Sequence, residues 1–171
     1  MEDILLLVDE KDNFLGYMGK EEAHVKGMKH RAFSIFVFNK KGELLIQRRA
    51  LHKYHTPGLW ANTCCSHPRY GETTLQAVHR RLPEEMGFDT ELDHVFEMSY
   101  QVSFDNGLTE NEYDHVFFGR YEEDPVINEE EVADFKWMSL EALKEDMEDA
   151  PEKYTFWFQK ILKEFDFKKL L

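Results

Sequence analysis

The hydrophobic positions in the first third of the chain form short apolar runs separated by polar turns. Residues 4–8 are a continuous apolar run, and the polar segment 9–13 follows them. Residues 32–38 are rich in Phe, Ile and Val, and 44–48 return to apolar character after the turn sequence of residues 39–42. This pattern predicts a buried strand at 4–8 and a hairpin of strands 32–38 and 44–48.

The spacing of apolar residues changes to helical spacing at residues 73–85. Leu75, Val78 and Leu82 are expected on one side, and charged residues occupy the other side. Gly87 suits the end of this helix, because glycine adopts the left-handed conformation that commonly ends helices. Pro83 removes one backbone hydrogen bond, so we expect it to bend the last turn of the helix.

A second hairpin is predicted in the following segment. Residues 95–104 and 113–121 have strand character and flank the turn sequence Asp105-Asn106-Gly107. A short strand is predicted at 135–138.

Two helices are predicted near the end of the chain. Ser139 is a suitable N-cap for a helix that ends near the Ala150-Pro151 break. A last amphipathic helix is expected to begin at about Lys153. Hairpins with a helix between them and helices at the end indicate an α+β fold of the α/β/α sandwich kind, in one domain spanning residues 1–171.

Charge and cysteine content narrow the range of partners and compartments. The net charge of −13 argues against nucleic acid, which requires a basic surface. The sequence has neither a secretion signal nor an apolar stretch of the length that crosses a membrane. Cys64 and Cys65 are adjacent, which is poor geometry for a disulfide, so we expect two reduced thiols in a cytoplasmic protein.

The segment of residues 66–88 resembles the Nudix box, a loop, helix and loop that binds metal ions and diphosphates. The residues in register with that pattern are Glu72, Arg80, Leu82, Glu84, Glu85 and Gly87. Carboxylates one helical turn apart point the same way and can bind a divalent cation that carries a diphosphate. Ser66 replaces the first glycine of the pattern, and Arg81 replaces a glutamate.

The replacement at Arg81 changes the expected chemistry. Nudix hydrolases use the missing carboxylate to hold the metal ion and the attacking water. Its loss argues against hydrolysis of a pyrophosphate bond. A guanidinium is better suited to binding the diphosphate oxygens directly.

Three further motifs resemble those of the type 1 isopentenyl-diphosphate isomerases of the Nudix superfamily. The run at residues 58–68 matches their Trp-x-Asn-x-x-Cys-x-His-Pro signature, and Glu110-Asn111-Glu112 matches a Glu-x-Glu motif. Upstream, residues 48–53 and the histidines at 24 and 30 fit the layout of the family. The resemblance extends from about Lys20 to Trp157. It implies a Nudix-like fold, with a mixed sheet and flanking helices.

The resemblance implies a metal site. Alternation along a strand places Glu110 and Glu112 on one face. By resemblance, the ligands of a divalent ion are His24, His30, His67, Glu110 and Glu112. Mixed nitrogen and oxygen ligands favour Mn²⁺, Mg²⁺ or Fe²⁺, although imidazole also suits Zn²⁺. Two alternatives stay open: histidines 24 and 30 on surface loops, or a zinc cluster that includes Cys65.

The resemblance also implies the catalytic residues. It assigns proton transfer on one face of the substrate to Cys65. On the opposite face, it assigns proton transfer to Glu112, assisted by the Tyr100 hydroxyl. A neighbouring metal ion would withdraw charge from Glu112. The indole of Trp157 would stabilise a developing carbocation. Taken without the resemblance, Cys65 is an inert buried thiol and Trp157 a core residue.

The implied substrate is a small isoprenoid diphosphate, bound by a monomer or a homodimer. Its diphosphate is expected to be held by Mg²⁺ on Glu85 and by four cationic residues: Lys20, Arg49, Lys53 and Arg81. Without the resemblance, these would be solvated surface charges. Two rival functions remain, a Nudix hydrolase of an organic or nucleoside diphosphate and a Nudix-like module that binds without catalysis.

Overall fold

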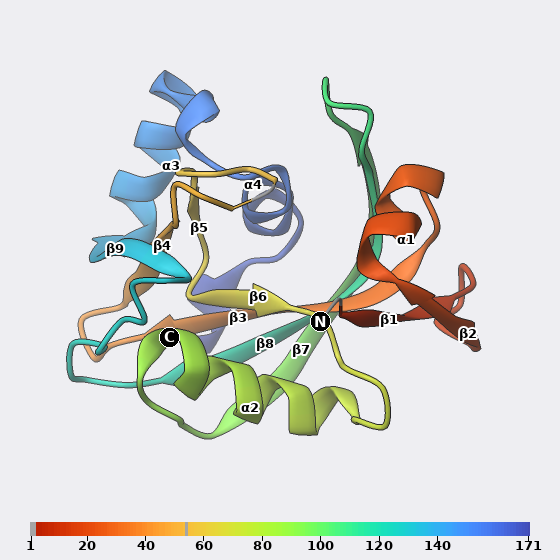
Figure 1. The fold of residues 1–171 in the computed structure, drawn as a ribbon. Coiled ribbons are helices and arrows are strands. Elements are labelled where there is room, and N and C mark those ends of the chain that lie inside the picture. The colour runs from red at the N-terminus through yellow and green to blue at the C-terminus, as the bar shows by residue number, and fades with distance from the viewer. Residues whose placement is uncertain (1–2, 54) are drawn as a thin grey trace.

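The computed structural model describes residues 3–53 and 55–171, and in this part of the chain nine strands form one mixed sheet. Figure 1 shows helix α2 on one side of the sheet and helices α3 and α4 on the other. The predicted α+β sandwich is therefore confirmed. The strands are β1 Ile4–Val8, β2 Phe14–Gly19, β3 His30–Phe38, β4 Glu43–Arg49, β5 Trp60–Ala61, β6 Cys64–Ser66, β7 Leu92–Ser103, β8 Thr109–Arg120 and β9 Val132–Ser139. The helices are α1 Lys20–Lys26, α2 Thr74–Met86, α3 Leu140–Asp149 and α4 Phe156–Glu164, with 3₁₀ turns at Pro151–Lys153 and Phe167–Leu170.

Strand β3 is buried on both faces, which explains its nearly continuous apolar sequence. Phe33 and Ile35 pack into the cluster that includes the apolar side of α2. Phe36 and Phe38 point to the opposite face and join the cluster that contains Phe158 of α4. The period of two along one strand therefore supplies both hydrophobic layers of the molecule.

The first predicted hairpin is correct in its turn but wrong in its pairing. Strands β3 and β4 share a single residue pair, Phe38 with Leu44. β3 instead runs parallel to β8, from the His30–Glu112 pair onward, while β4 pairs with β9. An apolar run specifies that a strand is buried but not which strand lies beside it. The parallel pairing brings the start of β3 next to the glutamates of β8.

The second predicted hairpin is confirmed, and its strands are longer than predicted. β7 and β8 pair antiparallel, and Tyr100 lies opposite Glu112. The turn includes Gly107 at φ 83°. Because β8 begins at Thr109, Glu110 and Glu112 both lie on the strand and share one face.

Several short elements were not predicted, and one helix begins later than predicted. β2 is largely exposed and has no clear alternation, and α1 has seven residues without a side-chain cap. β5 and β6 have two and three residues. The last helix begins at Phe156 rather than near Lys153, because Pro151–Lys153 form a separate 3₁₀ turn and Tyr154 bridges to Trp60.

Helix α2 begins and ends one residue later than predicted, and Leu75 is exposed, whereas Val78 and Leu82 are buried as predicted. Thr73 caps its first turn through reciprocal hydrogen bonds with Gln76. Gly87 ends the helix in the left-handed conformation, and its amide donates to the carbonyl of Pro83. The helix continues through Pro83 to Met86.

Gly87 should be far less tolerant of a side chain than Gly107. Both have positive φ, but a Cβ at Gly87 would lie 2.4 Å from the carbonyl oxygen of Val126, whereas a Cβ at Gly107 would meet nothing within 4 Å. We expect Gly107→Ala to lower the free energy of unfolding by about 1 kcal/mol and Gly87→Ala by about 3 kcal/mol or more. Urea denaturation measures both, and equal losses would contradict this account.

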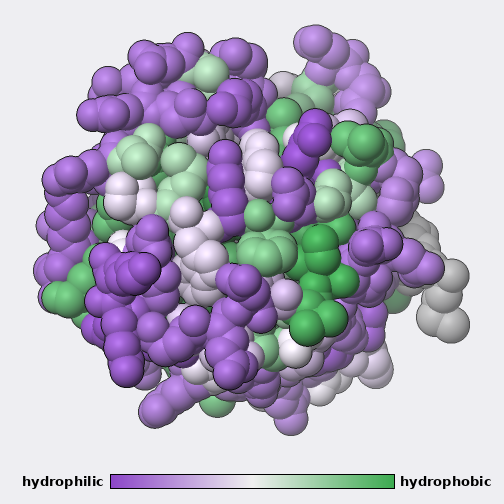
Figure 2. All heavy atoms as spheres, turned by 90° about the vertical axis from the view of Figure 1, so that its left-hand side faces the viewer, coloured by the Kyte–Doolittle hydropathy of each residue, from purple (hydrophilic) through white to green (hydrophobic). Residues whose placement is uncertain are grey.

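The surface has the polar character that the composition suggests. Figure 2 shows one face on which hydrophilic residues predominate and border smaller hydrophobic areas. Among the described residues, no helix is both long and apolar enough to cross a membrane.

Candidate active site

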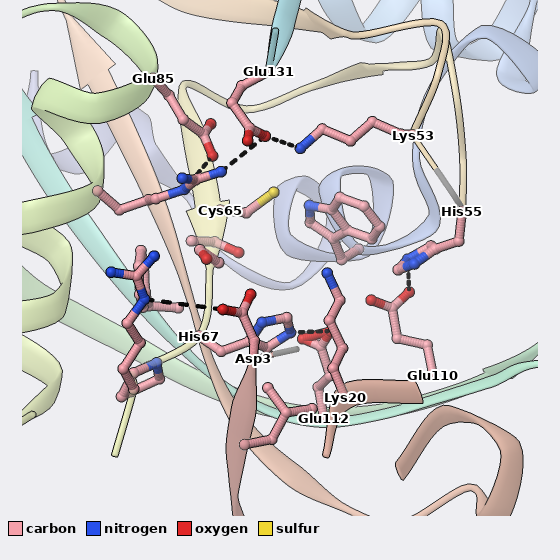
Figure 3. A pocket seen from close by; sticks show the side chains of 18 of the residues that line it. Asp3, Lys20, Lys53, His55, Cys65, His67, Glu85, Glu110, Glu112 and Glu131 are labelled. Carbon is pink, nitrogen blue, oxygen red and sulfur yellow. Dashed lines mark hydrogen bonds and ion pairs between the residues drawn. The ribbon is translucent and has the colours of Figure 1, made fainter. Parts of the chain in front are cut away.

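A cavity of about 310 Å³ gathers residues from most of the elements described above. Four residues that the resemblance names as catalytic line it: Cys65 of β6, Tyr100 of β7, Glu112 of β8 and Trp157 of α4. Figure 3 shows the Cys65 sulfur and the Lys20 amine directed into the same space. A thiol, a phenol, a carboxyl and an indole thus face one cavity although they are far apart in the sequence.

Four histidines and two glutamates form a buried cluster beside this cavity. Their potential ligand atoms fall into two groups whose members lie within 4.8 Å of one another: His24, His55 and Glu110, and His30, His67 and Glu112. All five ligands implied by the resemblance are in the cluster. His55 is a sixth member that the sequence analysis missed, and its Nε2 lies 3.2 Å from a carboxylate oxygen of Glu110.

His30 shows how the fold prepares an imidazole to bind a metal ion. Its Nδ1 is 3.0 Å from the carbonyl oxygen of Met28, which fixes the proton on that nitrogen. Its Nε2 is buried, makes no hydrogen bond to the described residues and lies 3.9 Å from an oxygen of Glu112. The lone pair on this nitrogen therefore faces the carboxylate. Such a donor set fits a divalent ion.

Burial favours the neutral form of three histidines of this cluster, His24, His30 and His67. It lowers the pKa of His67 well below its usual range, and the neighbouring His30 lowers it further. Burial likewise lowers the pKa of His24 to about 4. A neutral imidazole is the form that ligates metals.

Glu112 is a buried carboxyl that lines the cavity and belongs to the cluster. Burial, together with the negative charge of Glu110, raises the pKa of Glu112 well above its usual value. Tyr100 lies opposite it in the β7–β8 pair and is itself buried, which raises the pKa of the phenol. In the polypeptide alone, burial therefore favours the protonated form of both groups.

Cys65 is a partly buried thiol beside a cation. Its Sγ lies 3.8 Å from a guanidinium nitrogen of Arg49. Burial raises the pKa of Cys65 to about 12 even though the Arg49 charge lowers it. Both Cys64 and Cys65 are free thiols, as the sequence predicted.

The raised pKa of Cys65 predicts slow, pH-dependent alkylation. Iodoacetamide reacts with the thiolate, whose fraction grows tenfold per pH unit below the pKa. We expect the rate at Cys65 to rise about tenfold per unit from pH 7 to pH 10 without a plateau. Cys64, which is fully buried, should remain unmodified while the chain is folded. Peptide mass spectrometry follows both sites, and a plateau near pH 9 would contradict the assigned pKa.

Trp157 forms part of the cavity wall and part of the core. Its indole Nε1 donates a hydrogen bond to the Asn62 side chain at 3.1 Å, which fixes the orientation of the ring. The guanidinium carbon of Arg49 lies 5.4 Å from the ring centroid. The ring is therefore held in one orientation with its face available to a positive charge.

The cationic residues implied by the resemblance line the same cavity: Lys20, Arg49, Lys53 and Arg81. Burial and the positive charges of Lys53 and Arg49 lower the pKa of Lys20, although Asp3 opposes this. Glu131 forms ion pairs with Lys53, as Figure 3 shows, and with Arg81. Because these four cationic side chains line one cavity, that part of the cavity suits an anionic ligand.

Glu85 also lines the cavity. One of its carboxylate oxygens accepts a hydrogen bond from Gln47 at 2.8 Å, and the other accepts one from Arg81 at 2.7 Å. Each carboxylate oxygen has a second lone pair, so these contacts leave room for a metal ion. Arg80 of α2 forms an ion pair with Glu72, which ties the loop before α2 to the helix.

Two open alternatives from the sequence can be judged from the positions of the histidines. His24 and His30 are buried, so the hypothesis that they are surface loop residues is wrong. Among the residues that the structure describes, none of the potential metal-binding groups includes Cys65, which leaves the zinc-cluster alternative without support.

Sequence reasoning missed His55 and Glu131. His55 follows the 48–53 motif by two residues, so its position in the sequence was the available signal. Glu131 lies in a polar run of glutamates that gave no indication of a role.

Comparison with known proteins identifies the family of this chain. The NUDIX domain family matches residues 28–158. Isopentenyl-diphosphate Delta-isomerase 2 from Photorhabdus laumondii is 54% identical over 95% of this chain and 92% of its own length. The enzyme of the same name from Aromatoleum aromaticum is 51% identical over 95% of this chain and 86% of its own length.

Solved structures agree at the level of the fold. The MutT protein from Methanosarcina mazei superposes with a TM-score of 0.67 at 19% identity, covering 82% of this chain and 95% of its own. The MutT Nudix hydrolase from Burkholderia pseudomallei has a TM-score of 0.63 at 16% identity, covering 81% and 98%. On these findings, the chain belongs to the Nudix family and, within it, to the isopentenyl-diphosphate Delta-isomerases.

Proposed function

We propose that this chain interconverts isopentenyl diphosphate and dimethylallyl diphosphate. The reaction adds a proton to the terminal alkene carbon and removes one from carbon two, through or near a tertiary carbocation. The observation that carries the proposal is that Cys65 and Glu112 line one cavity together with the indole of Trp157. The family relatives named above support it.

Cys65 and Glu112 are the proposed proton-transfer groups, with Tyr100 assisting Glu112. One of the pair must be protonated and the other ionised before each turnover. Since the reaction is reversible, each donates in one direction and accepts in the other. A divalent ion bound to the histidines and glutamates would withdraw charge from Glu112 and favour its ionised form, which leaves one proton on the pair.

The aromatic side chains of Trp157 and Tyr100 are proposed to shield and stabilise the carbocation. A tertiary cation is a strong electrophile that water would capture, so the hydrocarbon end of the substrate needs a dry and electron-rich wall. Trp157 and Tyr100 are both buried and line the cavity. An indole face attracts a positive charge without supplying a ready lone pair.

The cationic wall is proposed to hold the diphosphate. Lys20, Arg49, Lys53 and Arg81 supply positive charge around the cavity. Arg81 retains guanidinium N–H donors beyond those engaged by its carboxylate partners, since the group has five. Glu85 is the proposed ligand of a Mg²⁺ ion that accompanies the diphosphate.

The proposed ligands of the other ion are His24, His30, His67, Glu110 and Glu112, and the structure adds His55 to the same cluster. Mixed imidazole and carboxylate ligands suit Mn²⁺ or Mg²⁺, and they also accommodate Zn²⁺.

Product analysis tests the proposed function. The protein is incubated with isopentenyl diphosphate and Mg²⁺, and the organic products and free phosphate are measured separately. We expect dimethylallyl diphosphate to form without release of phosphate. Phosphate or pyrophosphate release would favour a Nudix hydrolase, and binding without conversion would favour a non-catalytic module. Either result would overturn the proposal.

A further inference from the structure

We propose that a second group of side chains, remote from the cavity, binds one divalent transition-metal ion. The group comprises His94 and Glu97 of β7 and His115 of β8, with Asp12 from the β1–β2 turn behind His115. The potential ligand atoms of the first three lie within 4.8 Å of one another. None of the four residues lines the cavity, so the site is separate from the proposed active site.

An irregularity in β7 brings the three ligands together. Positions 94 and 97 are three residues apart, so a regular strand would direct them to opposite faces. The pairing with β8 shifts between His94 and Phe96, which inserts Val95 as one extra residue. Their partners on β8 are Phe117 and His115, two residues apart. The bulge therefore restores both side chains to one face, with Glu97 directly opposite His115.

His115 is already oriented as a metal ligand. Its Nε2 lies 2.8 Å from a carboxylate oxygen of Asp12, so the proton on this nitrogen is directed to the carboxylate. The lone pair of Nδ1 is then directed toward His94 Nε2 at 3.0 Å and toward a Glu97 oxygen at 3.7 Å. A carboxylate that receives the other N–H of a ligating histidine is a common feature of metal sites.

Asp12 is itself fixed in place. Its backbone has the left-handed φ of 65°, and Arg31 donates hydrogen bonds to its side chain and its carbonyl, both at 2.8 Å. The orienting carboxylate therefore belongs to a rigid turn. In contrast, His94 and Glu97 are exposed and can adjust to an ion.

The chemistry of the group selects the class of ion. Two imidazoles and one carboxylate match Zn²⁺, Co²⁺ or Ni²⁺, whereas Mg²⁺ prefers oxygen ligands. Metal–nitrogen bonds of about 2.0–2.1 Å in a tetrahedral site place ligand atoms about 3.3–3.4 Å apart. The two nitrogens need to separate by a few tenths of an ångström, and the Glu97 oxygen needs to approach by a similar amount. Water can complete the coordination of such an open site.

Counting bound ions in variants tests this site without relying on activity. Equilibrium dialysis against Co²⁺ gives the number of ions per chain for the wild type and for His94→Ala. We expect His94→Ala to bind one ion fewer, since the proposed active-site ligands are unchanged. His79→Ala is the matched control, because His79 is partly exposed and paired with a carboxylate, Asp89 at 2.7 Å, but belongs to none of the potential metal-binding groups found in the described residues.

Two further measurements sharpen the test. Asp12→Asn keeps all three ligands but weakens the orienting contact, so we expect binding at this site to weaken by about 10–100-fold. The visible absorption of bound Co²⁺ should lose one component in His94→Ala and keep it in His79→Ala. Melting curves without metal check that each variant folds. Equal ion counts and equal affinities in the wild type and His94→Ala would overturn the proposal, whatever the outcome of the isomerase assay.

Discussion

Replacing Cys65 with alanine, or Glu112 with glutamine, should each lower kcat for isomerisation by about 10²–10⁴-fold. Each substitution removes one of the two groups proposed to move protons across the cavity. Glu112→Gln keeps the shape and a hydrogen-bonding end, but it removes the acid–base function and one charged ligand of the proposed metal site. Turnover of isopentenyl diphosphate is measured at saturating substrate.

Cys64→Ala provides the matched control for Cys65→Ala. Cys64 is the adjacent thiol, but it is fully buried against the α2 side of the sheet and does not line the cavity. We expect this variant to keep kcat within a few-fold of the wild type. Melting temperatures establish that all three variants are folded. Turnover close to wild type in folded Cys65→Ala or Glu112→Gln would remove that residue from the proposed mechanism.

Removing divalent ions with a chelator should abolish nearly all activity. The buried cluster around Glu110 and Glu112 brings two carboxyls and four imidazoles together, and a bound cation would accept their lone pairs and balance the carboxylate charge. We therefore also expect the melting temperature to fall on chelation, because an ion that binds the folded state stabilises it. Adding Mn²⁺ or Mg²⁺ back should restore both properties, and their order of effectiveness identifies the ions that the site accepts.

The control for chelation is the same chelator saturated with the ion that restores activity, which should leave activity unchanged. His67→Ala should need a higher concentration of metal for half-maximal activity than the wild type. Full turnover in protein whose residual metal content is far below one ion per chain would contradict the proposed metal requirement.

Local sequence signals predicted the elements that carry strong patterns. The apolar spacing of α2 and the ending at Gly87 predicted that helix to within one residue at each end. The turn at residues 105–107 likewise defined the β7–β8 hairpin. In these segments, side-chain pattern, capping and turn chemistry all favour the same local structure.

Long-range pairing could not be read from the same signals. β3 and β4 are joined by a suitable turn, yet they diverge because each finds a better partner elsewhere in the sheet. The parallel pairing of β3 with β8 joins segments about 80 residues apart, and no local pattern encodes it. This pairing places His30 beside Glu112. The position of these two proposed metal ligands therefore depends on a strand pairing that the hydrophobic periodicity cannot predict.

The resemblance to family motifs predicted a set of site residues. The structure brings these residues together at one cavity and in the adjoining cluster. The resemblance did not name His55, whose role follows from its position between Glu110 and Trp157 rather than from a motif. Nor did it name Glu131, which balances the charges of Lys53 and Arg81. Residues that neutralise or orient others are set by three-dimensional neighbours and carry little sequence signature.

The reaction in heavy water tests the central claim, that two groups of one cavity add a proton at one carbon and remove one at another. Whichever of the Cys65 thiol and the Glu112 carboxyl carries the proton exchanges it with solvent before turnover. The account predicts that dimethylallyl diphosphate formed in heavy water carries deuterium in the methyl group derived from the terminal alkene carbon. A product free of deuterium at that carbon would contradict it.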